Sequence, residues 1–282
     1  MLKQLLCYCQ YILPHHLITF LVGKVAESKS SWLKNPLIDR FCRHYQVDLN
    51  EAAIDDPHAF PNFNQFFTRA LKDGIRPVAP DPLTIVSPVD GAISQIGHID
   101  HVKLLQAKNM YYSLDTLLGN DSESVSQFEG GEFATIYLAP RDYHRIHMPV
   151  TGTLKKAIYI PGRLFSVNGM TSRLIPNLFT RNERLVLTFD TEHGPMAVIL
   201  VGAMIVGSMQ TVWMDKPVRS NRMEIVTPDE KIQLEKGAEL GRFLMGSTVI
   251  LLFSKEKAKW GADLAPGQQL KYGQSIGKLI VS

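Results

Sequence analysis

The hydrophobic pattern of residues 1–26 has helical spacing and is interrupted once, at Pro14. The apolar positions on the two sides are Leu2, Leu5, Leu6, Cys9, Ile12, Leu13, Leu17, Phe20 and Leu21. Each run is shorter than the roughly 20 apolar residues that a helix needs to span a bilayer. The pattern therefore predicts two amphipathic helical pieces and no membrane span.

Beyond these helices the pattern changes to that of a β-rich protein. Residues 47–80 combine several prolines with an apolar patch at Phe63–Leu71, which predicts one helix among loops. After Leu83, strands are expected at Ala134–Ala139, Leu185–Phe189 and Met196–Val206, and short helical turns at Ser113–Leu118 and Met170–Leu174. The segment Gly241–Phe253 reads as one strand with a small polar step, and its apolar end, Val249–Phe253, is typical of a strand buried on both faces.

A weak internal repeat indicates how these strands are arranged. The turn Pro88-Val89-Asp90-Gly91 is echoed by Pro149-Val150-Thr151-Gly152, and Lys236–Gly241 is echoed by Tyr272–Gly277. Two related β units are thus expected to wrap together as a β-sandwich or hybrid barrel. The predicted fold is α+β: a mainly antiparallel β core at residues 81–282, and a helical segment at residues 1–80.

Composition and charge narrow the class of protein. The 282 residues are 45% hydrophobic and 20% charged, as in an ordinary folded chain, and the net charge of +3 is too small to indicate a nucleic-acid partner. The cysteines, Cys7, Cys9 and Cys42, are an odd and one-sided set, which favours a reducing compartment and apolar filling over disulfides or a metal site.

Residues 1–46 also carry an excess of basic side chains. The bases are Lys3, Lys24, Lys29, Lys34, Arg40 and Arg43, against the acids Glu27 and Asp39. Apolar faces with basic flanks suit a helix that lies in an anionic membrane interface. A helical hairpin packed on its own core is the alternative, and the residue pattern fits both about equally well.

Candidate chemistry begins with three small residues, Gly246, Ser247 and Thr248, in the Gly241–Phe253 segment. One reading is a β-bulge whose two hydroxyls bond to nearby carbonyls. The other is that Ser247 is a nucleophile directed at the carbonyl of Gly246, which carries no side chain. The second reading requires a base elsewhere in the chain.

Residues 141–149 are the densest chemical segment and supply two candidate bases, His144 and His147. Histidine is the usual base for a serine near neutral pH, and a carboxylate usually orients its ring. Asp90, in the first copy of the repeated turn, is the candidate for that role. The order Asp90, His147, Ser247 is weak evidence by itself, because nine histidines offer many such combinations.

Longer motifs make the chain resemble bacterial phosphatidylserine decarboxylase, an enzyme made as a pyruvoyl-dependent proenzyme. The matching motifs are Phe243-x-x-Gly246-Ser247-Thr248-Val249-Ile250, Pro140-Arg141-Asp142-Tyr143-His144-Arg145-x-His147, Pro88-x-Asp90-Gly91, Tyr11–Pro14, Phe63-Asn64-x-Phe66-Phe67, Pro161-Gly162-x-Leu164–Asn168 and Pro176–Phe179-x-Arg181–Arg184. Met245 stands where the family usually has leucine, a change that roughly conserves volume. The resemblance extends along almost the whole chain.

The resemblance implies a catalytic residue for each step. His147, held by Asp90, would deprotonate Ser247, which would attack Gly246 and split the chain into residues 1–246 and 247–282. Ser247 would become a covalent pyruvoyl group, which condenses with the serine amine of phosphatidylserine and accepts electrons as CO2 leaves. His144 would protonate the resulting carbanion. The family also implies a peripheral location on the cytoplasmic face of the cell membrane.

Two other functions remain open on the sequence alone. His98-x-x-His101 and His144-x-x-His147 offer four imidazoles, enough for a metal-dependent hydrolase, although the helical His-Glu-x-x-His context is missing. A noncatalytic lipid-binding module would instead leave the chain uncut. The sequence does not determine the oligomeric state, and a homo-oligomer is one option.

Overall fold

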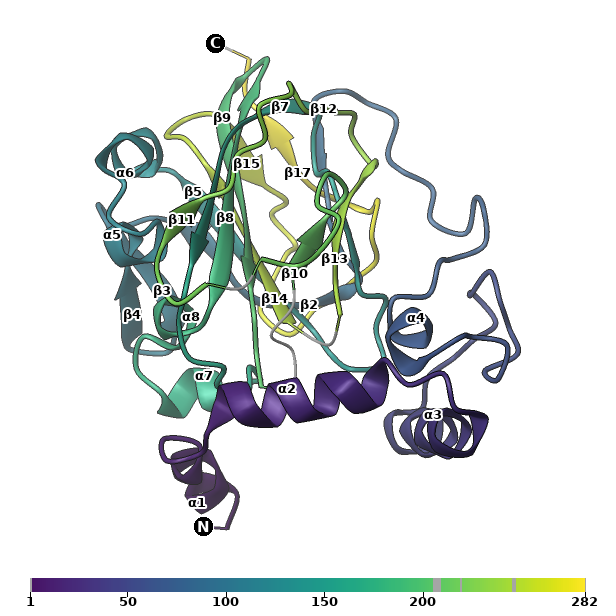
Figure 1. Ribbon diagram of the computed structural model, residues 1–282. Coiled ribbons are helices and arrows are strands. Elements are labelled where there is room, and N and C mark those ends of the chain that lie inside the picture. Colours follow the sequence, from purple (N-terminus) through teal and green to yellow (C-terminus); the bar gives the residue numbers. More distant parts are fainter. Residues whose placement is uncertain (1, 205–208, 219, 245–246, 282) are drawn as a thin grey trace.

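A nine-stranded antiparallel sheet forms the middle layer of the protein (Figure 1). The computed structural model describes residues 2–204, 209–218, 220–244 and 247–281. In this sheet the order is β11-β7-β8-β9-β14-β5-β2-β16, with β12 also pairing with β7. The strands are β2 (Gly91–His98), β5 (Glu132–Leu138), β7 (Gly152–Ile160), β8 (Arg184–Thr191), β9 (Gly194–Val201), β11 (Glu224–Ile225), β12 (Gln233–Leu234), β14 (Ser247–Phe253) and β16 (Gln269–Leu270).

Two three-stranded sheets cover one face of this large sheet. Their orders are β1-β17-β15 and β10-β13-β6. The strands are β1 (Thr84–Val86), β6 (Arg145–His147), β10 (Met209–Thr211), β13 (Glu239–Phe243), β15 (Ala258–Trp260) and β17 (Ser275–Leu279). Alternate side chains of the large sheet, such as Val249 and Leu251, join them in one apolar core.

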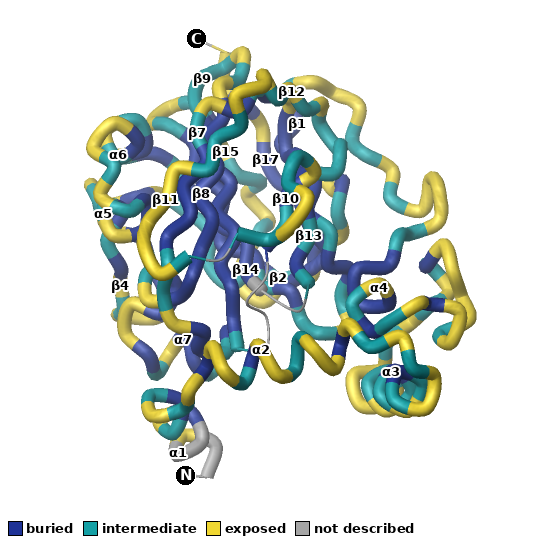
Figure 2. Tube along the Cα trace, viewed as in Figure 1, coloured by how far each residue is buried: buried dark blue, intermediate teal, exposed yellow. Residues whose placement is uncertain are grey.

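The opposite face is covered by a hairpin and four short helices. These are β3 (Lys103–Ala107), β4 (Met110–Ser113), α5 (Leu114–Leu117), α6 (Ser122–Phe128), α7 (Thr171–Leu174) and α8 (Leu178–Arg181). Ile250 and Leu252 of β14 pack into this second core. Because β14 lies between β5 and β9 and is buried on both faces, it is the centre of the fold (Figure 2).

The N-terminal helices lie along one end of the β layers (Figure 1). They are α1 (Leu2–Cys9), α2 (His15–Ala26), α3 (Ser31–Tyr45) and the short α4 (Phe63–Phe67). The helices α3 and α4 share a separate aromatic cluster, whereas Cys7 of α1 packs into the core on the helical side of the large sheet. No helix in the described ranges is long and apolar enough to cross a bilayer.

The internal repeat has a structural counterpart in two matching turns. Asp90 accepts a hydrogen bond from the backbone N–H of Tyr272 at 2.8 Å, and Thr151, its partner in the repeat, accepts one from that of Lys236 at 3.0 Å. Gly237 has a φ of 83°, a left-handed conformation that glycine adopts without strain, and the repeat-equivalent Gly273 has the same value. In both copies of the repeat, the side chain of the first turn therefore accepts a hydrogen bond from the backbone of the second turn.

The predicted α+β class with mainly antiparallel strands is confirmed, but three details of the prediction are wrong. The described strands form open sheets, so the hybrid barrel is not present. The segment Gly241–Phe253 is not one strand: β13 and β14 lie in different sheets, and no proline or charged residue between Phe243 and Ser247 marks this break in the sequence. The helix predicted at Phe63–Leu71 ends at Phe67.

Candidate active site

Asp90 is a buried carboxylate in the turn that leads into β2, with 3% of its surface exposed. Its oxygens accept hydrogen bonds from Arg76 at 2.8 Å, from Lys271 at 3.3 Å and from the backbone N–H of Tyr272 at 2.8 Å. The next residue must be glycine, because a Cβ on Gly91 would lie 2.5 Å from the carbonyl oxygen of Tyr137. Asp90 is therefore a fixed and ion-paired group.

Removing Arg76 is expected to destabilise the fold. The side chains of Arg76 and Asp90 are 7% and 5% exposed, and loss of one member of a buried pair typically destabilises by about 3 kcal/mol. We expect Arg76→Met to lower the free energy of unfolding in urea by this amount. The measurement uses a Ser247→Ala background to keep the chain uncut. In that background the double variant Arg76→Met/Asp90→Asn should lose less free energy of unfolding than Arg76→Met alone. An unchanged free energy of unfolding in Arg76→Met would contradict the stabilising role of the buried pair.

His147, the last residue of β6, is held as a neutral imidazole. Its Nδ1 lies 2.8 Å from the carbonyl oxygen of Gly237, which can only accept, so Nδ1 carries the proton. Its Nε2 then accepts from the hydroxyl of Tyr143 at 3.0 Å. The ring of Tyr272 stacks on the imidazole at 3.8 Å. Burial lowers the pKa of His147, which keeps the ring in its basic form at neutral pH.

The predicted direct hydrogen bond between Asp90 and His147 is not formed in this structure. The carboxylate is occupied by Arg76, Lys271 and the Tyr272 N–H, and Nδ1 of His147 is bonded to Gly237. Tyr272 links the two residues instead, since its backbone binds Asp90 while its ring lies on His147. Asp90 thus acts on the histidine through charge and through Tyr272.

His144 occupies a different environment from His147, although only two residues separate them. It is fully buried and its ring stacks on Phe67 of α4 at 4.0 Å. Neither ring nitrogen has a hydrogen-bond partner among the described residues. Burial, reinforced by the charge of Arg69, lowers the pKa of His144 to about 3, so the ring is neutral.

The predicted cleavage site lies at the start of the central strand. Gly246 lies outside the described residues, as does the side chain of Ser247, so the geometry of the predicted Asp90–His147–Ser247 triad stays a prediction. The backbone of Ser247 begins β14 opposite Leu138. Next to it, Thr248 is fully buried and its hydroxyl has no partner among the described residues.

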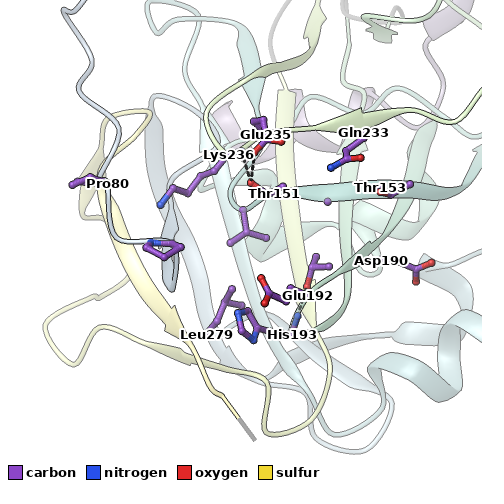
Figure 3. Close-up of a pocket in the computed structure, with 14 residues that line it drawn as sticks. Pro80, Thr151, Thr153, Asp190, Glu192, His193, Gln233, Glu235, Lys236 and Leu279 are labelled. Atoms are coloured by element: carbon purple, nitrogen blue, oxygen red, sulfur yellow. Dashed lines mark hydrogen bonds between the residues drawn. The ribbon is translucent and has the colours of Figure 1, made fainter.

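A cavity of about 570 Å³ reaches Thr248 from the side of the large sheet that the helices cover. Tyr137, which lies directly opposite Thr248 in the strand pairing, also lines it. A second cavity of about 580 Å³ lies near the C-terminal strand, beside Thr151, Glu235 and Lys236 (Figure 3). Within the described residues, none of the predicted site residues lines either cavity. The first is the candidate for substrate because Thr248, the residue after Ser247, lines it.

Sequence reasoning missed the tyrosines and the arginine of this site. Tyr143 was visible within the motif of residues 140–147, and its spacing of four from His147 was the available signal. Tyr272 could have been found from the repeat, because it corresponds to Lys236 beside Thr151. Arg76 had no local signal, since the loop that carries it reaches Asp90 only through the tertiary fold.

The metal-hydrolase alternative finds no support in the described residues. They contain no group of three or more His, Cys, Asp or Glu side chains placed to hold a metal ion. His98 instead lies at the surface, 3.3 Å from a carboxylate oxygen of Glu132. The two histidine pairs that suggested the alternative are therefore not gathered into one cluster.

A fixed carboxylate, a neutral buried histidine and a cavity at the start of the central strand together form the candidate active site. The model of the phosphatidylserine decarboxylase family matches residues 63–278, and a second family model, described as PSD, matches residues 5–46. The chain belongs to the phosphatidylserine decarboxylase family.

Individual relatives agree with the family match. A protein of Stutzerimonas stutzeri is 51% identical over 289 residues, which cover 100% of this chain and 97% of the relative. Proteins of Azotobacter vinelandii and Pseudomonas fluorescens are each 51% identical, with 96% and 98% of this chain and 97% and 98% of the relative covered. All three are named phosphatidylserine decarboxylase proenzyme.

Proposed function

We propose that this protein is a phosphatidylserine decarboxylase that matures from a proenzyme and converts phosphatidylserine into phosphatidylethanolamine and CO2. The observation that carries the proposal is the 51% identity, over the full chain, to a relative named as that proenzyme. The cavity beside Thr248 supports it, because it gives a substrate access to the start of β14. A noncatalytic lipid-binding module has no comparable support.

The proposed maturation uses the residues at the start of β14. His147 takes the proton of the Ser247 hydroxyl, whose oxygen attacks the carbonyl carbon of Gly246 and displaces the amide nitrogen to give an ester. Elimination breaks the ester, leaving a carboxylate on residue 246 and an unsaturated residue at 247. Uptake of water and release of ammonia convert residue 247 into a pyruvoyl group. The fragments are residues 1–246 and 247–282.

The surroundings of residue 247 suit such a group. The unpartnered hydroxyl of Thr248 is buried, and a buried polar atom without a partner is unfavourable unless a ligand satisfies it. The pyruvoyl carbonyl, once formed, supplies an electron-accepting centre for the loss of CO2. His144 is proposed to deliver a proton to the carbon that loses CO2. A substrate carboxylate near the ring would raise its pKa from about 3 and let it take up that proton.

The N-terminal helices are proposed to hold the enzyme on an anionic membrane surface. The helix α2 buries the polar residues His15 and Thr19 but exposes Leu17, Phe20 and Leu21, which are 54%, 48% and 55% exposed. This is the reverse of a helix in water, and it suits insertion of the apolar face into lipid. In this proposal residues 1–80 bind the cytoplasmic face of the cell membrane and residues 81–282 carry the catalysis.

Removing the apolar face of α2 should weaken membrane binding. Burying a leucine side chain contributes about 1.5–3 kcal/mol, so we expect Leu17→Gln/Leu21→Gln to reduce the partition coefficient onto anionic vesicles by about 100-fold. Vesicle sedimentation measures this. The control is Ile225→Gln, which removes a side chain 71% exposed on β11 and should leave binding unchanged. An equal loss of vesicle binding in both variants would argue against a specific role of the apolar face of α2 in binding lipid.

A direct test of the function follows the carboxyl carbon of the substrate. The purified protein, given phosphatidylserine labelled in the serine carboxyl group, should release labelled CO2 and form phosphatidylethanolamine. Mass spectrometry of the fragment 247–282 should show an N-terminal keto acyl group in place of serine. Release of CO2 from an uncut chain that lacks this group would overturn the proposed maturation.

A further inference from the structure

The cavity beside Thr248 has a positive lining. Its walls come from β2, β5, β14, β16, the end of β3, the helix α7 and the loop that leads into α7. None of its lining residues is aspartate or glutamate, whereas Lys108 and Arg173 both line it. A cavity with cations and no acidic side chains attracts an anionic ligand.

The two cations are free to bind such a ligand. Lys108 is exposed and has no ion pair or hydrogen bond with any described residue. Arg173 is exposed too, and its Nε donates to the carbonyl of Gly169 at 2.6 Å, which fixes the side chain while its terminal nitrogens stay unpaired among the described residues. By contrast, Lys155 and Lys156, on β7 of the same sheet, are paired with acidic side chains.

Neutral hydrogen-bond donors complete the lining. The side-chain amides of Gln95 and Gln269 have no hydrogen-bond partner in the described part of the chain. The hydroxyl of Tyr137 is also unpaired there, and burial raises its pKa to about 12, so that it stays protonated and can donate. An anion in this cavity would find charged and neutral donors together.

The cavity lies between the predicted cleavage site and the N-terminal helices. The loop that lines it, Val167–Gly169, continues the segment to which the N-terminal helices are bonded. Gln10 accepts from the backbone of Ser166 at 2.8 Å, and His16 lies 2.9 Å from the carbonyl of Gly162. The helix α1 contacts α7, and Figure 1 draws both α7 and α2 at the end of the sheet where β14 begins.

We propose that this cavity binds the phosphodiester of the glycerophospholipid substrate, with Lys108 and Arg173 paired to its anionic oxygens. This inference rests on the proposed function and assigns it a phosphate site. The phosphodiester lies between the serine head group and the acylated glycerol. Bound here, it directs the head group towards residue 247 and leaves the acyl chains to extend towards the apolar face of α2.

Substrate kinetics test the phosphate site directly. The substrate is a short-chain phosphatidylserine below its critical micelle concentration, so that membrane binding plays no part. A charge-assisted hydrogen bond contributes enough that Lys108→Met or Arg173→Met should raise KM about 10-fold, and the double variant about 100-fold. We expect kcat to change less than about 3-fold, and Lys108→Arg and Arg173→Lys should restore most of the affinity. The controls, Lys231→Met and Arg222→Gln, remove exposed cations elsewhere.

Three further measurements distinguish a phosphodiester site from a free-phosphate site and from a membrane contact. Gel analysis should show that each variant is cleaved like the wild type. If the wild-type protein is cleaved but has no decarboxylase activity, the proposed function itself is contradicted. Glycerophosphoethanolamine should compete more strongly than inorganic phosphate if the site recognises a diester, and the reverse order would indicate a free-phosphate site. Unchanged KM for short-chain substrate, with weaker sedimentation on anionic vesicles, would overturn the proposal and make the cations a membrane contact.

Discussion

Ser247→Ala is expected to leave the chain at its full mass of 31.7 kDa and without decarboxylase activity. Alanine has no oxygen to attack the preceding carbonyl, so neither the ester nor the pyruvoyl group can form. Denaturing electrophoresis and mass spectrometry of the purified protein should show one species. The wild type, in contrast, should give the fragments 1–246 and 247–282.

A matched control lies just beyond the same strand. Ser254 follows the end of β14, and its hydroxyl donates to the carbonyl of Gln127 at 2.7 Å. We expect Ser254→Ala to be cleaved as completely as the wild type, because this hydroxyl is at the end of the strand remote from residue 246. Cleavage of Ser247→Ala at the same junction would show that another group is the nucleophile.

The cleaved fragments should remain together under native conditions. The fragment that starts at Ser247 contributes β14, which pairs with β5 on one side and with β9 on the other. Its side chains from Val249 to Leu252 are fully buried. Hydrogen bonding on both edges and burial on both faces make dissociation highly unfavourable. Native size exclusion should therefore give one peak, which separates into two fragments only in denaturant.

The elements with a strong local pattern could be predicted from the sequence. The strands β5, β8, β9 and β14 consist mostly of apolar β-forming residues. The structure has β5 and β8 close to the expected bounds, whereas β9 ends at Val201 and β14 begins only at Ser247. The break between β13 and β14 could not be predicted, because no proline or charged residue stands between them and only their assignment to different sheets separates them. Neighbours in a sheet are determined by the whole fold.

The candidate site was predictable in its chemistry but not in its contacts. The motifs pointed to Asp90, His144 and His147, yet not to the partners of these side chains. Arg76 competes for Asp90 because a charged donor forms a stronger bond with a carboxylate than a neutral imidazole does. Such competition depends on tertiary distances, which no spacing along the chain contains.

His147→Ala is expected to slow cleavage by about 100-fold to 10,000-fold, the usual contribution of a general base. The neutral ring is the active form, and burial lowers its pKa below the ordinary value of about 6.5. The wild-type rate should therefore be constant from neutral pH to below 6.5 and should fall only as the pH drops through the lowered pKa. The cleavage rates are measured on full-length protein that is made by cell-free translation and then incubated at each pH.

Tyr143→Phe distinguishes a base from a merely structural histidine. The tyrosine hydroxyl donates to Nε2 of His147 and thereby favours the neutral ring, so its removal should raise the pKa of His147. The fall in the cleavage rate should then begin at a higher pH than in the wild type, while the rate at high pH is retained because the ring is still present. A profile that does not move in Tyr143→Phe, together with normal cleavage in His147→Ala, would assign the proton transfer to another group.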